Sequence, residues 1–393
     1  MKLLTLILLI YSRMGINNFL AFLKTNYPQL VRTEHISMYA YQRVFVDISS
    51  YIYKYLCVYG RINNRWLNAM VNLVITFKES GVHIVPVFDG KAPQEKLDEL
   101  KDRKAKREKS GDRIGCLAEA IELYRSGDRS ESTISTLEKE LKSADRKGSR
   151  LQRLLAPKTD VEDVISETDL KSLEQCIYDM KRQIIIISQD DLALLKRVFT
   201  SLGVSWMQAE GESEGFCCWM VKQGLGAAIV SCDSDCIIHG VDDFIFNLEP
   251  DGTVTHIEIE EVLEDLELTQ KQLIDYAIIM GCDYNRYLKV NKIGPVKALA
   301  SIKKYGCIEN IPTVEEDAKQ GLNKECLLYE RCRELFQPTF NTDFCIPNHE
   351  VNVDDCAKLQ RDHHLDKHLI TRAIAANKPV NITFQEEEPS LHL

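Results

Sequence analysis

Short apolar runs rich in β-branched residues recur along this chain and predict buried strands. Segments with apolar residues at helical spacing separate most of these runs, for example at 62–79, 190–202 and 213–223. Strands that alternate with helices predict an α/β fold with a mostly parallel central sheet flanked by helices. The runs expected to be strands are 43–49 (RVFVDIS), 82–90, 183–188 (QIIIIS), 226–235 and 243–248.

Carboxylates follow three of these predicted strands. Asp47 closes one run, Asp89 closes the next, and Asp233 and Asp235 close the run that begins at residue 226. Side chains alternate along an extended strand, so Asp233 and Asp235 are expected to point the same way. A single aspartate at such a place is usually a helix cap or a turn residue. Three strand ends with this feature instead indicate a site at the carboxyl edge of the sheet, where α/β proteins bind ligands.

Further acids lie at the ends of two predicted helices. Glu210, Glu212 and Glu214 surround the N-terminus of the helix predicted from residue 213, where the helix dipole partly compensates their charge. Capping alone does not require three glutamates. Asp283 follows the helical segment 271–280, and an acid at a helix C-terminus is unfavourable without a nearby cation.

Carboxylates gathered in one cleft would repel one another and lose their hydration. Divalent cations resolve that conflict, and ligands that are all oxygen favour Mg²⁺ or Mn²⁺ over zinc. Two such ions about 4 Å apart support phosphodiester hydrolysis. We therefore expect a centre for two Mg²⁺ ions, with Mn²⁺ as the alternative, built from Asp47, Asp89, Glu212, Glu214, Asp233, Asp235 and Asp283.

Residues 91–182 are highly charged and poor in strand-like runs, so we expect helices and a mobile loop inserted between two strands. Within them, 139–158 carry seven Lys or Arg against two acids. Such a run is often only a solvated helix face. The segment 91–109 is mixed but net basic, and its position directly after Asp89 favours a role in binding.

A second basic stretch lies in the C-terminal third. It has six Lys or Arg and no acid between Asn285 and Lys304. The segment KIGPVKA (292–298) predicts a tight turn that opens a helix, whose free N–H groups suit phosphate oxygens. This favours a contact with the DNA backbone. The histidines of 363–368 (HHLDKH) are expected on an exposed amphipathic helix, not at a metal.

Composition limits which partners and cellular locations are expected. The 393 residues carry a net charge of −10, which alone disfavours a nucleic-acid partner, although a cluster of catalytic acids would also make the charge negative. The 13 cysteines include no CxxC pair, as expected for free thiols in a reducing compartment. Residues 1–13 resemble a weak signal-peptide core, but we expect Met14 to be the functional start and no segment to cross a membrane. A secreted protein is the alternative.

Seven motifs occur in an order that resembles the XPG/flap-endonuclease family of structure-specific 5′ nucleases, which has a PIN-like fold. The resemblance runs from Met14 to about residue 310 and is poorer at about 110–180. It rests on MGINNFL, VFVDISSYIY, VFDGKAPQEK, EGESE, CDSD, GCDY and IGPVKA.

The resemblance implies roles for individual residues. The seven acids become the metal ligands, Lys96 and Arg103 reach the scissile phosphate, and Tyr53 stacks on a base near the cut. Lys292, Gly294 and Lys297 belong to a helix–two-turn–helix that grips duplex DNA and often holds K⁺. Since Lys292 stands where the family usually has glycine, K⁺ binding stays open while phosphate contact is expected to persist.

The expected organisation follows the family. Residues 1–13 are an extension, 14–110 and 183–310 form the nuclease, 111–182 form the arch for a 5′ strand, and 311–393 are helical. We expect a monomer that binds branched or flapped DNA without a sliding-clamp peptide. The expected location is the nucleus, or the host nucleus for a viral protein, with the cytoplasm as the alternative.

The favoured function is a Mg²⁺-dependent DNA endonuclease that cuts flaps, gaps or junctions in replication, repair or recombination. A 5′→3′ exonuclease or a Holliday-junction resolvase of the same family is the alternative. A catalytically inactive junction-binding protein is disfavoured by the complete set of acids. An RNA-directed PIN-like nuclease is disfavoured by IGPVKA, which suits duplex DNA.

Overall fold

The computed structural model describes residues 16, 19–144, 165–285, 293–312, 324, 327–342 and 344–377. The chain divides into two compact units. One comprises residues 1–99 and 187–393, and the other comprises residues 100–186. The expected extension at 1–13 lies outside the described residues.

A seven-stranded mixed sheet organises the first unit, in the order β1-β7-β6-β5-β2-β3-β4. The five strands from β6 to β4 run parallel, whereas β7 pairs antiparallel with both β6 and β1. This confirms the mostly parallel α/β sheet. The strands are β1 (Arg32–His35), β2 (Arg43–Asp47), β3 (His83–Phe88), β4 (Met207–Gln208), β5 (Ala228–Val230), β6 (Asp243–Leu248) and β7 (Thr253–Glu258).

The centre of the sheet is covered on both faces. Val44, Phe45 and Val46 of β2 are all fully buried, which explains why this strand reads as a continuous apolar run. From β2 the chain builds outward to β3 and β4 on one side, and from β5 to β6 and β7 on the other. The boundary between β2 and β5 is therefore a topological switch point, where open α/β sheets bind ligands.

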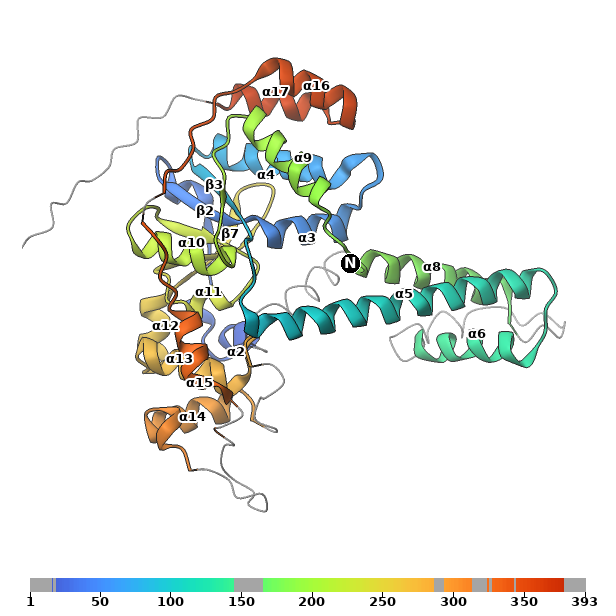
Figure 1. Ribbon diagram of the computed structural model, residues 1–393, viewed down its shortest axis with the longest axis horizontal. Helices are drawn as coiled ribbons and strands as arrows, with labels where there is room; N and C mark the ends of the chain where they lie inside the picture. Colours follow the sequence, from blue (N-terminus) through green and yellow to red (C-terminus); the bar gives the residue numbers. More distant parts are fainter. Residues whose placement is uncertain are drawn as a thin grey trace, which may run out of the picture. The chain divides into compact units, whose positions relative to one another are not determined.

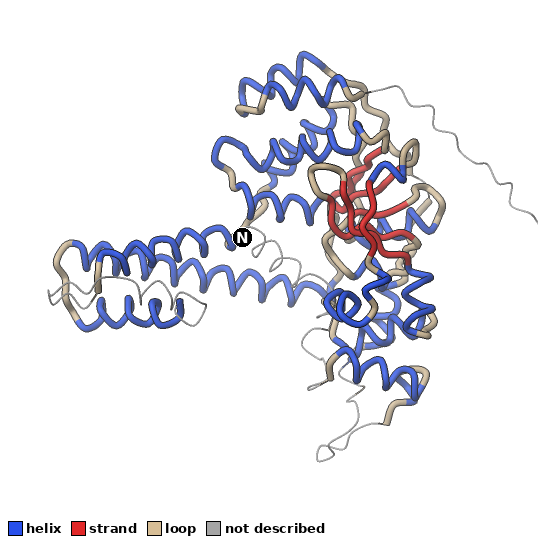
Figure 2. The backbone as a smooth tube through the Cα atoms, turned by 180° about the vertical axis from the view of Figure 1, so that it is seen from behind, coloured by secondary structure: helices blue, strands red, loops and turns tan. Residues whose placement is uncertain are grey.

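Helices lie on both sides of the sheet (Figure 2). Helices α3 and α4 pack against β3, while α10 packs against β2, β3 and β5. The helices of the first unit after the initial α2 (Phe19–Asn26) are α3 (Ile48–Tyr59), α4 (Arg65–Glu79), α9 (Gln189–Ser201), α10 (Ser213–Lys222), α11 (Asp235–Ile238), α12 (Ile259–Leu266), α13 (Gln270–Met280), α14 (Pro295–Tyr305), α15 (Tyr329–Phe336), α16 (Val353–His363) and α17 (Lys367–Ala375).

The second unit has a small helical core of its own. Its helices α5 (Leu97–Arg125), α6 (Glu131–Ala144) and α8 (Glu167–Gln183) run alongside one another (Figure 1). Leu117, Leu137 and Leu173 are almost completely buried between them. The helices expected in this insertion are present, while 145–164 lie outside the described residues.

Three expectations about secondary structure are wrong. The run 226–235 is a strand only at β5, which ends at Val230, and Asp235 already belongs to α11. Residues 184–188 form no strand, because Ile184 packs on the helical core of the second unit and β4 takes the place beside β3. The segment 363–368 is not one helix, since α16 ends at His363 and α17 begins at Lys367. His364 between them adopts a left-handed conformation, with φ of 54°. Within the described chain, every helix is too short or too polar to cross a bilayer.

Candidate active site

Three neighbouring strands deliver acids to one edge of the sheet. Asp47 is the last residue of β2, and Asp89 follows β3, which pairs with β2. Asp233 comes three residues after β5, the neighbour of β2 on the other side. Because these strands are parallel, their carboxyl ends coincide. Asp47 and Asp233 are 5% and 8% exposed, so both carboxyl groups are largely removed from water.

Asp235 reaches the site by a route that differs from the expected one. Strand β5 ends at Val230, and Asp235 begins helix α11. Its N–H donates to Oδ1 of Asp233 at 2.9 Å, so a turn brings the two acids together instead of alternation along an extended strand. Asp235 is 2% exposed, and its Oδ1 has no hydrogen-bond partner among the residues that the structure describes.

Glu212 and Glu214 enter from the N-terminus of α10. Glu212 is the N-cap residue but makes no side-chain cap hydrogen bond. Its Oε2 accepts instead from the hydroxyl of Tyr284, at 2.9 Å. Asp283 precedes this tyrosine, in the turn that follows α13. The segment GCDY therefore contributes one acid and a hydrogen bond that orients another.

Lys96 supplies the cation that this group of acids lacks. It ends the short helix η4 (Gln94–Lys96), and its Nζ bonds to Glu212. The same Nζ lies 3.3 Å from Oδ2 of Asp283 and 3.9 Å from Oε1 of Glu214. Burial alone would lower the pKa of Lys96, but the charges of Glu214, Glu212 and Asp283 outweigh it and raise that pKa well above its ordinary value.

Four of these acids have a raised pKa. Burial raises the pKa of Asp47 to about 6, and the charge of Asp89 acts in the same direction. Burial raises the pKa of Asp233 to about 7, and the nearby charge of Asp283 adds to this. Burial and then the charge of Asp233 raise the pKa values of Glu214 and Asp235 well above the ordinary range. The seven predicted acids therefore form one electrostatically coupled group.

This group fits hard divalent cations. Its donors are carboxylate oxygens, the ligand type that Mg²⁺ and Mn²⁺ prefer. One buried oxygen, Oδ1 of Asp235, lacks any partner, and the lysine at the centre shows that the site stabilises positive charge. A buried acidic cluster with an unsatisfied oxygen is what a cation site requires.

The other predicted site residues belong to other segments of the sequence than these acids. Tyr53 is partly buried on α3, and Arg103 is exposed on α5 in the second unit. Gly294 is the N-cap of α14, Pro295 follows at its first turn, and Lys297 is exposed. Lys292 lies outside the described residues.

A second cluster of possible metal ligands lies on β6 and β7. Ligand atoms of Asp243, His256 and Glu258 lie within 4.8 Å of one another. His256 Nε2 is already 2.6 Å from Asp243, and Glu258 pairs with Arg32 at 2.7 Å. These groups satisfy one another, so the cluster is explained without an ion.

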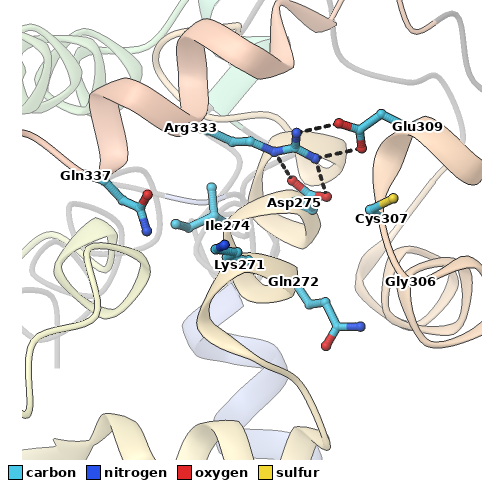
Figure 3. Close-up of a pocket in the computed structure, with 9 residues that line it drawn as sticks. All are labelled: Lys271, Gln272, Ile274, Asp275, Gly306, Cys307, Glu309, Arg333 and Gln337. Atoms are coloured by element: carbon cyan, nitrogen blue, oxygen red, sulfur yellow. Dashed lines mark hydrogen bonds and ion pairs between the residues drawn. The ribbon is translucent and has the colours of Figure 1, made fainter.

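A cavity of about 470 Å³ opens between α13, α15 and the segment that follows α14 (Figure 3). Arg333 crosses it and contacts both oxygens of Asp275 at 2.6 Å and both oxygens of Glu309 at 2.6 and 2.9 Å. One guanidinium is thereby paired with two carboxylates, and the network ties α13 to α15 instead of presenting a reactive group.

Sequence reasoning missed the polar residues that hold the acids in place. Ser213 and Ser231 both donate to Asp47, at 2.7 and 2.8 Å, and Tyr284 donates to Glu212. The available signal was local, because Ser213 separates two glutamates and Ser231 directly follows β5. A serine among several acids is a common surface pattern, so this signal was weak.

Comparisons with known proteins identify the relatives of this chain. The XPG N-terminal domain model matches residues 14–110, and the XPG I-region model matches residues 203–283. The probable RAD2-like endonuclease 369L of Invertebrate iridescent virus 6 is 26% identical over 367 residues, covering 88% of this chain and 83% of the relative. Flap endonuclease 1 of Glycine max is 30% identical over 352 residues, covering 84% of this chain and 76% of the relative.

The fold has solved counterparts. The catalytic core of Rad2 in complex with DNA substrate matches with a TM-score of 0.57 and 16% identity, covering 92% of this chain and all of the other. At that identity the match bears on the fold. Together with the extended match to flap endonuclease 1, it leads to one conclusion: the chain belongs to the XPG/flap-endonuclease family of structure-specific 5′ nucleases.

Proposed function

We propose that this protein is a structure-specific 5′ DNA endonuclease of the flap-endonuclease type that hydrolyses phosphodiester bonds with two divalent metal ions. One observation carries the proposal. Acids from separate segments gather at the switch point of a parallel sheet, and three of them, Glu212, Glu214 and Asp283, lie around Lys96. Because the chain belongs to a family of nucleases, phosphodiester hydrolysis is the reaction that we assign to this acidic site.

The metal ligands would be Asp47, Asp89, Glu212, Glu214, Asp233, Asp235 and Asp283. When bound, Mg²⁺ or Mn²⁺ lowers the pKa of water and stabilises negative charge on a phosphodiester. The protein's own part is to hold the carboxylates at fixed positions. Ser213, Ser231 and Tyr284 do so by donating hydrogen bonds to them.

Cationic and aromatic side chains would act on the DNA. Lys96 is assigned to the scissile phosphate, where a cation stabilises the charge that develops during hydrolysis. Arg103 is also assigned to the scissile phosphate. Tyr53 is assigned to a base beside the cut, because stacking holds a base whatever its sequence. Water is the nucleophile, so no covalent intermediate with the protein is expected.

Helix α14 is assigned to duplex DNA. Its N-terminus combines the Gly294 cap with Pro295, and exposed Lys297 lies in its first turn. Backbone N–H groups at such a terminus suit a phosphate oxygen. Lys292 belongs to the same proposed element, and K⁺ binding there is left to experiment.

Substrate choice within the family is the open part of the proposal. Residues 111–182 are assigned to the arch, and a 5′ flap is the favoured substrate. A 5′→3′ exonuclease and a Holliday-junction resolvase are the alternatives. A monomer is proposed. DNA as substrate supports a nuclear location, in the host nucleus for a viral protein, or a cytoplasmic one where DNA is replicated there.

The proposal is tested with the full chain and four labelled DNAs: a 5′ flap, a nicked duplex, a four-way junction and a single strand. We expect cleavage at the base of the flap in Mg²⁺ and none in EDTA. Asp233→Ala should reduce the rate of that cleavage by more than about 100-fold. Replacing a residue that only orients a metal ligand typically reduces activity by about 10–100-fold.

Asp243→Asn is the matched control, since Asp243 belongs to the separate cluster on β6 and β7 and should leave the cleavage rate unchanged. Preferred cutting of the four-way junction would replace the flap with the resolvase assignment. Binding of the flap without cleavage in Mg²⁺ or Mn²⁺ would contradict the nuclease proposal.

A further inference from the structure

One serine contacts two of the seven acids at once. Oγ of Ser213 lies 2.7 Å from Oδ1 of Asp47 and 2.7 Å from Oδ1 of Asp89. The N–H of Ser213 also donates to Oδ1 of Asp89, at 2.9 Å. Ser213 is 1% exposed and Asp47 is 5% exposed, whereas Asp89 is exposed.

These contacts join two strands through the first residue of a helix. Asp47 ends β2, Asp89 follows β3, and Ser213 begins α10. Two oxygens that are each 2.7 Å from the same atom can lie no more than twice that distance apart. The hydroxyl therefore sets an upper limit on the separation of two carboxylates that would otherwise repel each other.

Ser213 also limits how each carboxylate can turn. Asp89 Oδ1 accepts from the N–H of Ser213 and lies 2.7 Å from its hydroxyl, whose single proton is shared between Asp47 and Asp89. Asp47 is fixed from its other side as well, because Ser231 donates to its Oδ2 at 2.8 Å. The remaining lone pairs of Asp47 and Asp89 are thereby held in set directions.

We infer that Ser213 is a positioning residue that sets the geometry of Asp47 and Asp89 for a divalent cation. This inference rests on the proposed metal-dependent function and deepens it. Residues that orient metal ligands by hydrogen bonding commonly control affinity for the ion. Ser213 acts through the two acids and is not expected to touch the ion or the DNA.

The competing interpretation is that Ser213 only stabilises the start of α10. Glu212, the N-cap residue of α10, makes no side-chain cap hydrogen bond. The hydroxyl of Ser213 could therefore stabilise this end of the helix without any role at a metal. Loss of such a contact lowers the melting temperature and leaves metal affinity unchanged. Metal affinity therefore separates the two interpretations, and activity alone does not.

The experiment measures Mn²⁺ binding to the full-length protein without DNA, by isothermal titration calorimetry, for wild type and Ser213→Ala. Mg²⁺-dependent flap cleavage is measured alongside. We expect the variant to bind Mn²⁺ about 10–100-fold more weakly. It should also need a higher Mg²⁺ concentration for half-maximal cleavage and recover much of its rate at saturating Mg²⁺.

Ser50→Ala is the matched control. Ser50 is also buried, at 3% exposed, and its hydroxyl donates to the backbone carbonyl of Asp47 at 2.9 Å instead of its carboxylate. It should lower the melting temperature without changing Mn²⁺ affinity. Ser213→Thr keeps the hydroxyl and should bind Mn²⁺ more tightly than Ser213→Ala.

The outcomes separate this inference from the proposed function. A wild type that binds Mn²⁺ and cuts DNA, beside a Ser213→Ala variant with unchanged Mn²⁺ affinity, overturns the role of Ser213 alone. The same holds if Ser50→Ala weakens Mn²⁺ binding as much as Ser213→Ala does. A wild type that neither binds Mn²⁺ nor cuts DNA overturns both.

Discussion

The ammonium group of Lys96 lies 3.3 Å from Oδ2 of Asp283, inside the group of acids assigned to metal ions. It also bonds to Glu212 and lies 3.9 Å from Glu214. A cation that is part of the protein therefore occupies the surroundings in which a metal would bind. The proposed metal binding would use the same carboxylates as this ion pairing.

Replacing Lys96 should have opposite effects on the affinity for metal and on the cleavage rate. Lys96→Met keeps much of the side-chain volume and removes the charge. We expect Mn²⁺ to bind at least about 10-fold more tightly, because the competing positive charge is gone. Cleavage should fall by about 100-fold or more, since the charge that we assign to the scissile phosphate is lost. Calorimetry and a flap-cleavage assay measure the two effects.

Lys91→Met is the control for that pair of measurements, because Lys91 is an exposed lysine in the same segment. It should change neither value appreciably. Weaker Mn²⁺ binding by Lys96→Met would mean that the lysine supports the metal site instead of competing with it.

Stability without metal should fall as the pH rises. Folding raises the pKa values of Asp47 and Asp233 from 3.8 to about 6 and about 7. A raised pKa favours the folded protein while the acid is protonated, and that stability is lost as the pH rises through the folded-state value. The window is therefore about pH 4 to 7. The effect is on the order of a few kcal/mol.

Melting temperatures at pH 5.5 and pH 8 in EDTA test this pH dependence. The wild type should lose stability between the two, and Asp233→Asn should lose less. Mg²⁺ should raise the melting temperature more at pH 8 than at pH 5.5, because it binds the charged carboxylates. Equal pH dependence in wild type and Asp233→Asn would contradict the assignment.

The network around Arg333 should matter for stability. Arg333 contacts both Asp275, whose side chain is 3% exposed, and Glu309. These contacts hold the pKa of Glu309 down to about 2. Arg333→Met would leave the buried Asp275 charge unpaired, which we expect to cost about 3 kcal/mol of unfolding free energy. Urea denaturation measures this loss.

Arg331→Met is the matched control on the same helix. Arg331 is 49% exposed and pairs with Glu95 and Glu334. Such surface pairs contribute less than about 1 kcal/mol. A loss for Arg333→Met no greater than that for Arg331→Met would rule out a structural role for this network.

The sequence predicted the acidic site more completely than it predicted the strands. Asp47 and Asp89 were found because continuous apolar runs end at them, and such runs indicate central parallel strands. By contrast, β1 consists of the polar residues RTEH at the edge of the sheet, and β4 is only two residues long. Neither has enough apolar residues to be recognised.

Two errors have the same physical cause. The run at 184–188 looked like a strand because isoleucine is β-branched, yet Ile184 packs on a helical core instead. The alternation expected between Asp233 and Asp235 failed because β5 ends at Val230 and a turn follows. Local pattern does not reveal which tertiary partner a segment finds. The contacts of Ser213 were hidden for that reason too.

Lys297 should contribute to DNA affinity through a phosphate. Lys297→Ala is expected to weaken flap binding by a similar factor for different DNA sequences. It should also reduce the slope of log binding constant against log salt concentration by about one. The cleavage rate at saturating DNA should stay near the wild-type value. Fluorescence anisotropy at several salt concentrations measures the first two effects.

Lys303→Ala serves as the control from the same helix, because Lys303 already pairs with Glu267 at 2.6 Å. Its effect on the salt slope should be smaller. An unchanged slope for Lys297→Ala would remove this lysine from the DNA interface.

The central claim is that the seven acids form a metal centre. A crystal of the full-length protein with Mn²⁺, examined by anomalous diffraction at the manganese edge, tests it most directly. We expect two peaks among the carboxylates of Asp47, Asp89, Glu212, Glu214, Asp233, Asp235 and Asp283, and none after Asp233→Ala together with Asp235→Ala. Manganese bound only at Asp243, His256 and Glu258, or not bound at all, would contradict the account.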